Sequence, residues 1–251
     1  MSVKSAVRVL EIFELLAGHP NGLTVKEISE ALSFPQSSTF HLVQTLFSND
    51  YISQTIMKRY KLGPKLIQLG TRASDSLDLH SDAQPHLEKL MNEVQETVFM
   101  AVLSGEEIVY VSKFDNYRSI RTSAQIGSRK PLYCTGLGKA FLTFLPGKER
   151  KQLLEHAELK AVTAKTITDR SVLEEQLKQF AKNGYAIDDE ESEEGLFCLS
   201  APIFNAAGRM TAAISVAGPK ERITSRKQEI VHHLLHAAAS VSRSIGYNRP
   251  S

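Results

Sequence analysis

Three groups of residues have types and spacings that could do chemistry. Gly136-Leu137-Gly138 stands where a helix is predicted to begin, and backbone amides at a helix start can bind a carboxylate or a phosphate. His232 and His236 are four residues apart, which is the spacing of two metal ligands on one helix. Cys134 and Cys198 are candidate nucleophiles.

Each group also has a structural explanation. The glycines do not form a P-loop, because Tyr133 occupies a required glycine position and Ala140 follows Lys139 where Ser or Thr is needed; close packing explains them as well as anion binding does. Neither cysteine has a recognisable base beside it, which favours small buried apolar residues. The paired histidines lie opposite the apolar face of their predicted helix without a further ligand type, which favours exposure to solvent, with a bound divalent metal as the alternative. We therefore expect no catalytic residue, no metal site and no cofactor.

Length and composition indicate a two-domain globular protein. The chain has 251 residues, more than one core of about 100 to 150 residues comfortably holds, and it is 42% hydrophobic and 23% charged. The N-terminus lacks the apolar region and cleavage site of a signal peptide, and no apolar run approaches the roughly 20 residues of a membrane span. Two cysteines suit a reducing compartment, so we expect a cytoplasmic protein without a membrane partner. The net charge of +2 is too small to indicate a nucleic-acid partner by itself.

The first 62 residues have the pattern of a winged helix-turn-helix. Apolar residues recur at helical spacing over residues 5–17, and Thr24 and Glu27 form a capping box at the start of a short second helix. Pro35 opens a third helix over residues 35–47, and two β-like runs, 51–55 and 58–62, predict a hairpin. The alternatives are some other small all-α unit, or a winged helix used for protein contacts.

In a winged helix-turn-helix the third helix enters the major groove of DNA, and its N-terminal side chains meet base edges. Cations of the hairpin meet phosphates or the minor groove. The candidate DNA contacts are therefore Gln36, Ser37, Ser38, Thr39, His41, Lys58 and Arg59. We expect substitution of Ser38 or His41 to relax base preference, and neutralisation of Arg59 to weaken all DNA binding and its salt dependence.

The remaining chain predicts a linker helix over residues 64–80 and a second domain over 81–251, after a DNA-binding domain at 1–63. Strands are expected at 98–103, 108–114, 120–126, 185–188, 199–204 and 211–216, with a loop at 127–133. Helices are expected from 82, at 136–145, from Ser171 to 183 and at 225–245. This mixture favours an α+β sensor-like domain with an antiparallel sheet.

The sequence resembles the IclR family of bacterial transcriptional regulators over nearly its whole length. The motifs that carry the resemblance are residues 5–10, 23–28, 35–39 and 59–63 in the first domain and 133–140, 184–191, 198–202 and 213–219 in the second. The resemblance implies a winged helix-turn-helix followed by an effector-binding domain related to GAF sensor domains. One departure is His41, where the family usually carries an arginine; the imidazole is charged only at lower pH.

The resemblance also implies an effector pocket. It places Gly136, Asp188, Cys198 and Ser215 around the ligand, with Ala217 where relatives often have serine. Lys130 stands where an apolar residue is frequent and would add a cation for an acidic ligand. We therefore expect a small organic acid, such as a 2-oxo acid or a sugar acid, as the effector.

These observations together predict a regulator that is not an enzyme: a repressor of a catabolic operon, released from double-stranded operator DNA by its effector. Paired recognition helices require at least a homodimer, and a dimer of dimers is a further expectation. The alternatives are an activator of the same architecture, a ligand sensor that contacts other proteins, and a small-molecule enzyme with an accessory helical domain. The enzyme would need a nucleophile and base or a complete metal set, and the sequence shows neither at adequate spacing.

Overall fold

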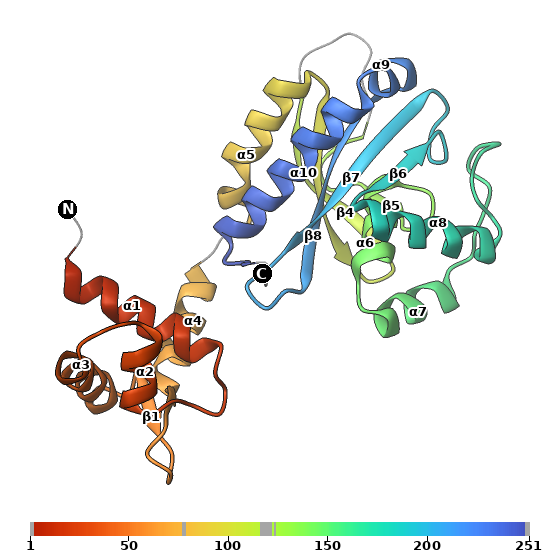
Figure 1. The fold of residues 1–251 in the computed structure, drawn as a ribbon. Helices are drawn as coiled ribbons and strands as arrows, with labels where there is room; N and C mark the ends of the chain where they lie inside the picture. Colours follow the sequence, from red (N-terminus) through yellow and green to blue (C-terminus); the bar gives the residue numbers. More distant parts are fainter. Residues whose placement is uncertain (1–2, 77–78, 116–121, 123, 249–251) are drawn as a thin grey trace. The chain divides into compact units, whose positions relative to one another are not determined.

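The chain divides into two compact units, Met1–Leu77 and Asp78–Ser251 (Figure 1). The computed structural model describes residues 3–76, 79–115, 122 and 124–248. The first unit is mainly helical with a two-stranded hairpin, and the second combines helices with a six-stranded antiparallel sheet. The predicted α+β fold class is confirmed, with a winged helix-turn-helix in the first unit.

The first unit runs helix, helix, helix, hairpin, helix. Its elements are α1 (Lys4–Ala17), α2 (Val25–Ala31), α3 (Gln36–Ser48), β1 (Ile52–Gln54), β2 (Tyr60–Leu62) and α4 (Pro64–Ser76). The capping box forms as predicted, since the Thr24 amide donates to Glu27 Oε2 at 2.7 Å and the Glu27 amide to Thr24 Oγ1 at 3.3 Å. The core of this unit consists of the buried residues Ile12, Leu16, Ile28, Val43, Leu46, Ile52 and Tyr60.

The second unit is built on a sheet with the strand order β5-β4-β3-β8-β7-β6, antiparallel at every step. The strands are β3 (Thr97–Ser104), β4 (Glu107–Phe114), β5 (Arg129–Pro131), β6 (Ala186–Asp189), β7 (Leu196–Phe204) and β8 (Met210–Pro219). The helices are α5 (Leu79–Val94), α6 (Gly136–Phe144), α7 (Gly147–His156), α8 (Arg170–Asn183), α9 (Lys220–Ser225) and α10 (Lys227–Ser244).

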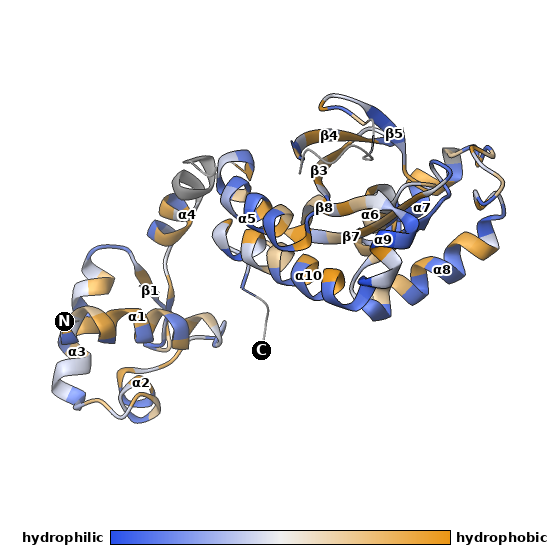
Figure 2. Cartoon of the chain, turned by 90° about the horizontal axis from the view of Figure 1, so that it is seen from above, coloured by the Kyte–Doolittle hydropathy of each residue, from blue (hydrophilic) through white to orange (hydrophobic). Residues whose placement is uncertain are grey.

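Helices cover both faces of this sheet, so the unit has two apolar layers. Helices α5 and α10 pack together on one face, and α6 with α8 lies on the other (Figure 1). Figure 2 shows that α8 and α10 each carry hydrophobic and hydrophilic residues, as amphipathic helices at a surface do. Among the described residues, no helix has both the length and the apolar character that crossing a membrane requires.

Several predicted boundaries in the second unit were wrong. Strand β5 lies where a loop was predicted, whereas residues 124–126 form no strand; 120, 121 and 123 lie outside the described residues. Helix α7 was not predicted, because Pro146 ends one helix and at once caps the next. Helix α8 begins one residue before the predicted Ser171, since Asp169 caps it by accepting from the Ser171 and Val172 amides at 2.7 and 3.2 Å. The last predicted helix, 225–245, corresponds to α10, and the short helix α9 before it was not predicted.

The predicted linker helix corresponds to α4, followed by α5 from Leu79; residues 77–78 lie outside the described residues. The unit boundary after Leu77 places α4 with the N-terminal unit.

Candidate nucleic-acid interface and effector pocket

The third helix, α3, presents polar side chains at its N-terminal half. Gln36, Ser37 and His41 are exposed, as a base-reading surface requires. Ser38 is half-buried, and its hydroxyl accepts a hydrogen bond from Arg8 Nη1 at 3.2 Å. Phe40, outside the predicted set, is 47% exposed beside His41, with the two rings 5.8 Å apart.

The prediction for Thr39 needs correction. Its side chain is fully buried, and its hydroxyl donates to the Pro35 carbonyl at 3.1 Å. It therefore supports the helix from within and cannot reach DNA. Thr39, Val43 and Leu46 are all buried in α3, and this i, i+4, i+7 spacing is the sequence signal that identifies its inward face.

The hairpin β1–β2 forms the wing, and its two predicted cations differ in role. Lys58 is exposed in the turn. Arg59 is half-buried: its Nε donates to the Gly22 carbonyl at 2.9 Å, and its Nη2 lies 2.9 Å from Glu27 Oε1. The pKa of Glu27 is lowered mainly by the hydrogen bond from the Thr24 amide, and next by the hydrogen bond from Arg59. Arg59 therefore braces the wing against the start of α2, and its Nε and Nη2 are occupied by these contacts rather than by a phosphate.

Neutralising these adjacent cations is expected to give different results. Arg59→Gln removes the brace, so we expect the melting temperature of the N-terminal unit to fall by a few degrees and DNA affinity to fall with it. Lys58→Gln should leave the melting temperature unchanged and reduce the salt slope of DNA binding by about 1. Thermal melts and salt titrations of both variants check this. A reduced salt slope for Arg59→Gln at an unchanged melting temperature would restore Arg59 as a phosphate contact.

A small cavity lies between α6 and the sheet of the second unit. Five of the six predicted effector residues line it, together with polar and aromatic neighbours that were not predicted. The lining residues are Phe99, Tyr110, Thr122, Thr135, Gly136, Leu137, Asp188, Ser192, Leu196, Cys198, Ser215 and Ala217. Lys130 does not line the cavity; it lies on strand β5, opposite Ile108.

The sheet register explains why residues distant in sequence meet here. Asp188 on β6 is paired with Cys198 on β7, and Cys198 is paired with Ala217 on β8. The three side chains therefore form a row across three strands. Gly136 begins α6 directly above this row, because a Cβ atom there would lie 2.7 Å from Ser200 Oγ and 3.2 Å from Cys198 Cβ.

The two glycines of α6 have different surroundings. A Cβ atom at Gly138 would collide with the backbone of Leu132, so that glycine permits close packing. Its amide is already used, since it donates to the Thr135 hydroxyl at 3.1 Å. Gly136 and Leu137 line the cavity, and their amides belong to the first turn, which has no preceding helical carbonyls to bind.

The carboxylate of Asp188 in the cavity is held by hydrogen bonds from the segment that follows β6. Asp188 is 1% exposed; its Oδ1 accepts from the Glu191 and Ser192 amides at 2.8 and 3.3 Å, and its Oδ2 accepts from the Ser192 hydroxyl at 2.5 Å. Burial raises the pKa of Asp188, while these hydrogen bonds and Lys139 oppose the rise.

Behind the cavity lies a buried ion pair that was not predicted. Lys139 is completely buried; its Nζ contacts Glu191 Oε1 and donates to Gln176 Oε1 at 3.0 Å. Burial raises the pKa of Glu191, whereas the charge of Lys139 acts to lower it. The pair fixes the segment that carries Asp188 and Ser192.

The stability of this unit should change with pH in a direction set by Asp188. Its folded-state pKa is raised above the unfolded value of 3.8, so its contribution to stability is complete below 3.8 and is lost as pH rises through the folded-state pKa. We therefore expect the free energy of unfolding of Asp188→Asn, relative to the wild type, to increase as pH rises from 3.8 towards 7, by about 1.4 kcal/mol per unit of pKa shift. Urea unfolding followed by circular dichroism at several pH values measures it.

Glu190 is the matched control, since Lys165 and Lys220 lower its pKa to about 2. Its contribution is present above 4.5 and lost as pH falls through the folded-state pKa, so Glu190→Gln should shift stability equally at pH 5 and 7. A constant difference between Asp188→Asn and wild type would contradict the prediction.

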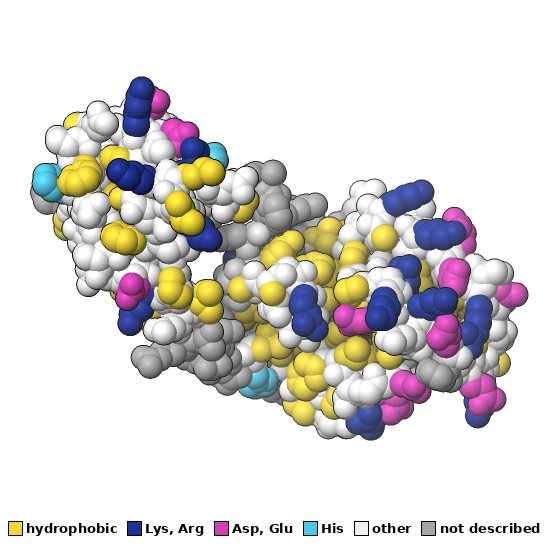
Figure 3. Space-filling view, turned by 90° about the horizontal axis from the view of Figure 1, so that it is seen from below, with side chains coloured by type: hydrophobic (Ala, Val, Ile, Leu, Met, Phe, Trp, Pro, Cys, Tyr) yellow, Lys and Arg dark blue, Asp and Glu magenta, His cyan; other side chains and the backbone are white. Residues whose placement is uncertain are grey.

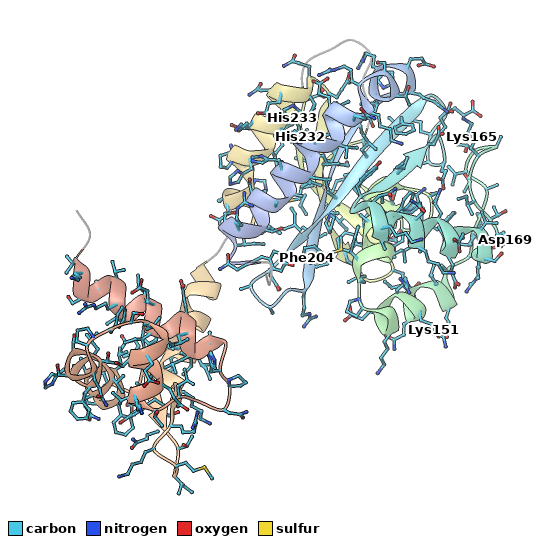
Figure 4. All side chains as sticks on the ribbon, viewed as in Figure 1. Lys151, Lys165, Asp169, Phe204, His232 and His233 are labelled. Atoms are coloured by element: carbon cyan, nitrogen blue, oxygen red, sulfur yellow. The ribbon has the colours of Figure 1, made fainter. Side chains whose placement is uncertain are left out.

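The cysteines and histidines have structural surroundings. Both cysteines are buried, and burial raises the pKa of Cys134 to about 12, which keeps its thiol protonated at neutral pH. His233, labelled in Figure 4, has its Nδ1 2.9 Å from Glu93 Oε2, and His232 and His236 are exposed on the same helix. Among the described residues, no group of three or more His, Cys, Asp or Glu side chains is arranged to hold a metal ion.

Comparison with known proteins covers both units. The sequence-family model of the IclR helix-turn-helix domain matches residues 5–55. The family model of the bacterial transcriptional regulator IclR C-terminal domain matches residues 71–243. The HTH-type transcriptional regulator KdgR of Escherichia coli is 34% identical over 98% of this chain and 94% of its own. The transcriptional repressor IclR of Escherichia coli is 34% identical over 97% of this chain and 90% of its own.

Solved structures agree. The crystal structure of the Thermotoga maritima IclR has a TM-score of 0.66 at 33% identity, covering 97% of this chain and 99% of that one. The Agrobacterium tumefaciens repressor BlcR has a TM-score of 0.82 at 26% identity, covering 99% of both chains. A winged helix-turn-helix followed by an α+β domain of this kind defines a DNA-binding transcriptional regulator, not an enzyme. The chain belongs to the IclR family, which confirms the resemblance found in its sequence.

Proposed function

We propose that the chain is a repressor that dissociates from operator DNA when a small organic acid binds in the cavity between α6 and the sheet. The observation that carries the proposal is the juxtaposition of the first turn of α6 with Asp188 and Ser215 in the lining of one cavity. A repressor is favoured because relatives that cover nearly the whole chain are named as repressors.

The chemistry of the cavity supports an acid that also carries hydroxyl groups. The amides at the start of α6 suit a carboxylate. Asp188 is an acceptor and would repel a second carboxylate, but it binds a hydroxyl well. No Lys or Arg is among the described lining residues, and Lys130 lies elsewhere on β5. A sugar acid therefore fits better than a simple 2-oxo acid.

Control of DNA binding requires a differential effect on two states of the protein. The acid must bind more tightly to an arrangement of the recognition helices that does not match the operator, because a ligand with equal affinity for both states shifts nothing. Two helices α3 must reach half-sites on one duplex, so the functional unit is at least a homodimer, with a dimer of dimers as the larger assembly. We place this action in the cytoplasm.

Fluorescence anisotropy on the DNA upstream of its own gene, against scrambled DNA, tests the proposal with a panel of sugar acids and 2-oxo acids. Release of selective binding by a sugar acid supports it, and release by 2-oxo acids alone would change the ligand class. In vitro transcription from the same DNA separates the repressor from the activator, the second candidate with this architecture. Absence of selective binding at every salt concentration would overturn the regulatory function.

A further inference from the structure

The tip of the wing carries two large apolar side chains that the protein itself does not cover. Ile56 is fully exposed, at 104%, and Met57 is 82% exposed. The hairpin projects below the label β1 in Figure 1. Single exposed apolar residues are common on proteins, so exposure alone assigns no role. The position of Ile56 and Met57 at the tip of a rigid wing indicates a role for them.

The backbone of the turn is held on both sides. The Thr55 amide donates to the Arg59 carbonyl at 2.8 Å, and the Lys58 amide donates to the Thr55 carbonyl at 2.9 Å. Lys58 has a positive φ of 56°, which closes the turn tightly. Arg59 then fixes the hairpin to Glu27 and Gly22. The entropy of ordering the tip is therefore already lost before any partner binds.

The wing is also fixed to the recognition helix. Gln44 Nε2 on α3 donates to the Tyr60 hydroxyl at 3.1 Å, and the rings of Phe47 and Tyr60 meet edge to face at 6.0 Å. Placing α3 in a major groove therefore carries the wing to a fixed position beside it.

The charge around the tip identifies the kind of partner. Residues 51–62 contain Lys58, Arg59 and Lys61 and no Asp or Glu. Lys58 and Lys61 are exposed, and Figure 3 shows cationic and apolar side chains on one face of the N-terminal unit. The exposed cations can contact phosphates, and the apolar side chains beside them can enter the DNA groove that those phosphates border.

We propose that Ile56 and Met57 form an apolar wedge that enters the minor groove beside the major groove occupied by α3. Apolar side chains in a minor groove partly unstack a base step and bend the duplex. Steps that unstack easily, TA and CA, would then be preferred at a position where no hydrogen bond reads a base. The inference rests on DNA binding by this unit and goes beyond it in assigning specificity to two residues without polar groups.

The test compares Ile56→Ser/Met57→Ser with Lys58→Gln in the full-length protein. Wild-type selectivity for upstream over scrambled DNA is established first, so that failure of DNA binding and failure of the wedge are distinguishable. Affinity is measured at several salt concentrations, and the bend by energy transfer between dyes at the two ends of the duplex. The substituted side chains are exposed, and a thermal melt confirms that both variants are folded.

We expect the double variant to bind about tenfold or more weakly, with a smaller bend and an unchanged salt slope. Lys58→Gln should keep the bend and lose about 1 from the salt slope. Wild-type affinity and bend in the double variant would overturn the proposal. A reduced salt slope at an unchanged bend would also overturn it, since the tip would then only position cations.

Discussion

Replacing Lys139 by methionine is expected to lower the free energy of unfolding of the C-terminal unit by about 3 to 5 kcal/mol at pH 7. The Lys139 side chain is 0% exposed and that of Glu191 4%, so removal of the cation leaves a carboxylate in a medium that solvates it poorly. Glu191 Oε2 has no hydrogen-bond partner, and without Lys139 the carboxylate keeps only a long hydrogen bond, 3.5 Å, from Gln176 Nε2 to Oε1. Urea unfolding followed by circular dichroism measures the loss.

The cause of the loss can be separated from a loss of packing. Burial already raises the pKa of Glu191, and without Lys139 protonation becomes easier still, so the defect should shrink as pH falls towards 5. Lys139→Met/Glu191→Gln should regain most of the stability, because both buried charges are then gone. Lys151, 78% exposed in its pair with Glu155 and labelled in Figure 4, is the matched control, and Lys151→Met should change nothing measurable. Equal losses for Lys139→Met and the double variant would contradict a role for the charge.

Features that depend on neighbouring residues could be predicted from the sequence. The capping box at Thr24 requires only Glu27 three residues on, and the stop of α8 at Gly184 requires one residue with a φ of 81°. The order of these local signals was enough to predict the winged helix-turn-helix. The short strand β5 was not predicted, because three residues at a sheet edge give almost no periodic pattern.

Roles that depend on distant partners could not be predicted in this way. Arg59 is a cation in a wing, and only its contacts to Gly22 and Glu27, 37 and 32 residues away, convert it into a brace. Lys139 fails the P-loop pattern, and its partner Glu191 lies 52 residues further on, in an acidic run that resembles an ordinary solvated loop. Asp188, Cys198 and Ala217 were placed in the pocket by family resemblance, and the sheet register now supplies the physical reason for their proximity.

Gly136→Ala is expected to weaken effector binding at least tenfold while leaving operator binding intact, so that the acid no longer releases the DNA. The added methyl group lies above the row of Asp188 and Cys198, at 3.6 and 3.2 Å from their Cβ atoms, and occupies the space where the ligand is proposed to meet the first turn of α6. It also lies 2.7 Å from Ser200 Oγ, which predicts an overpacking cost of about 1 to 3 kcal/mol. Anisotropy on operator DNA during titration with the acid, together with urea unfolding, measures both effects.

A second substitution separates the two effects of the methyl group. Ser200 Oγ is buried without a hydrogen-bond partner, so Ser200→Ala removes the clashing atom without breaking a bond. Gly136→Ala/Ser200→Ala should therefore regain stability and still bind the acid poorly, because the methyl group remains in the cavity. Gly147→Ala on α7 is the control for an added helical methyl group, since the nearest atom would lie 4.0 Å away, on the flexible side chain of Arg150. Wild-type release of DNA by the acid in the double variant would mean that Gly136, like Gly138, serves only close packing and that the anion is bound elsewhere.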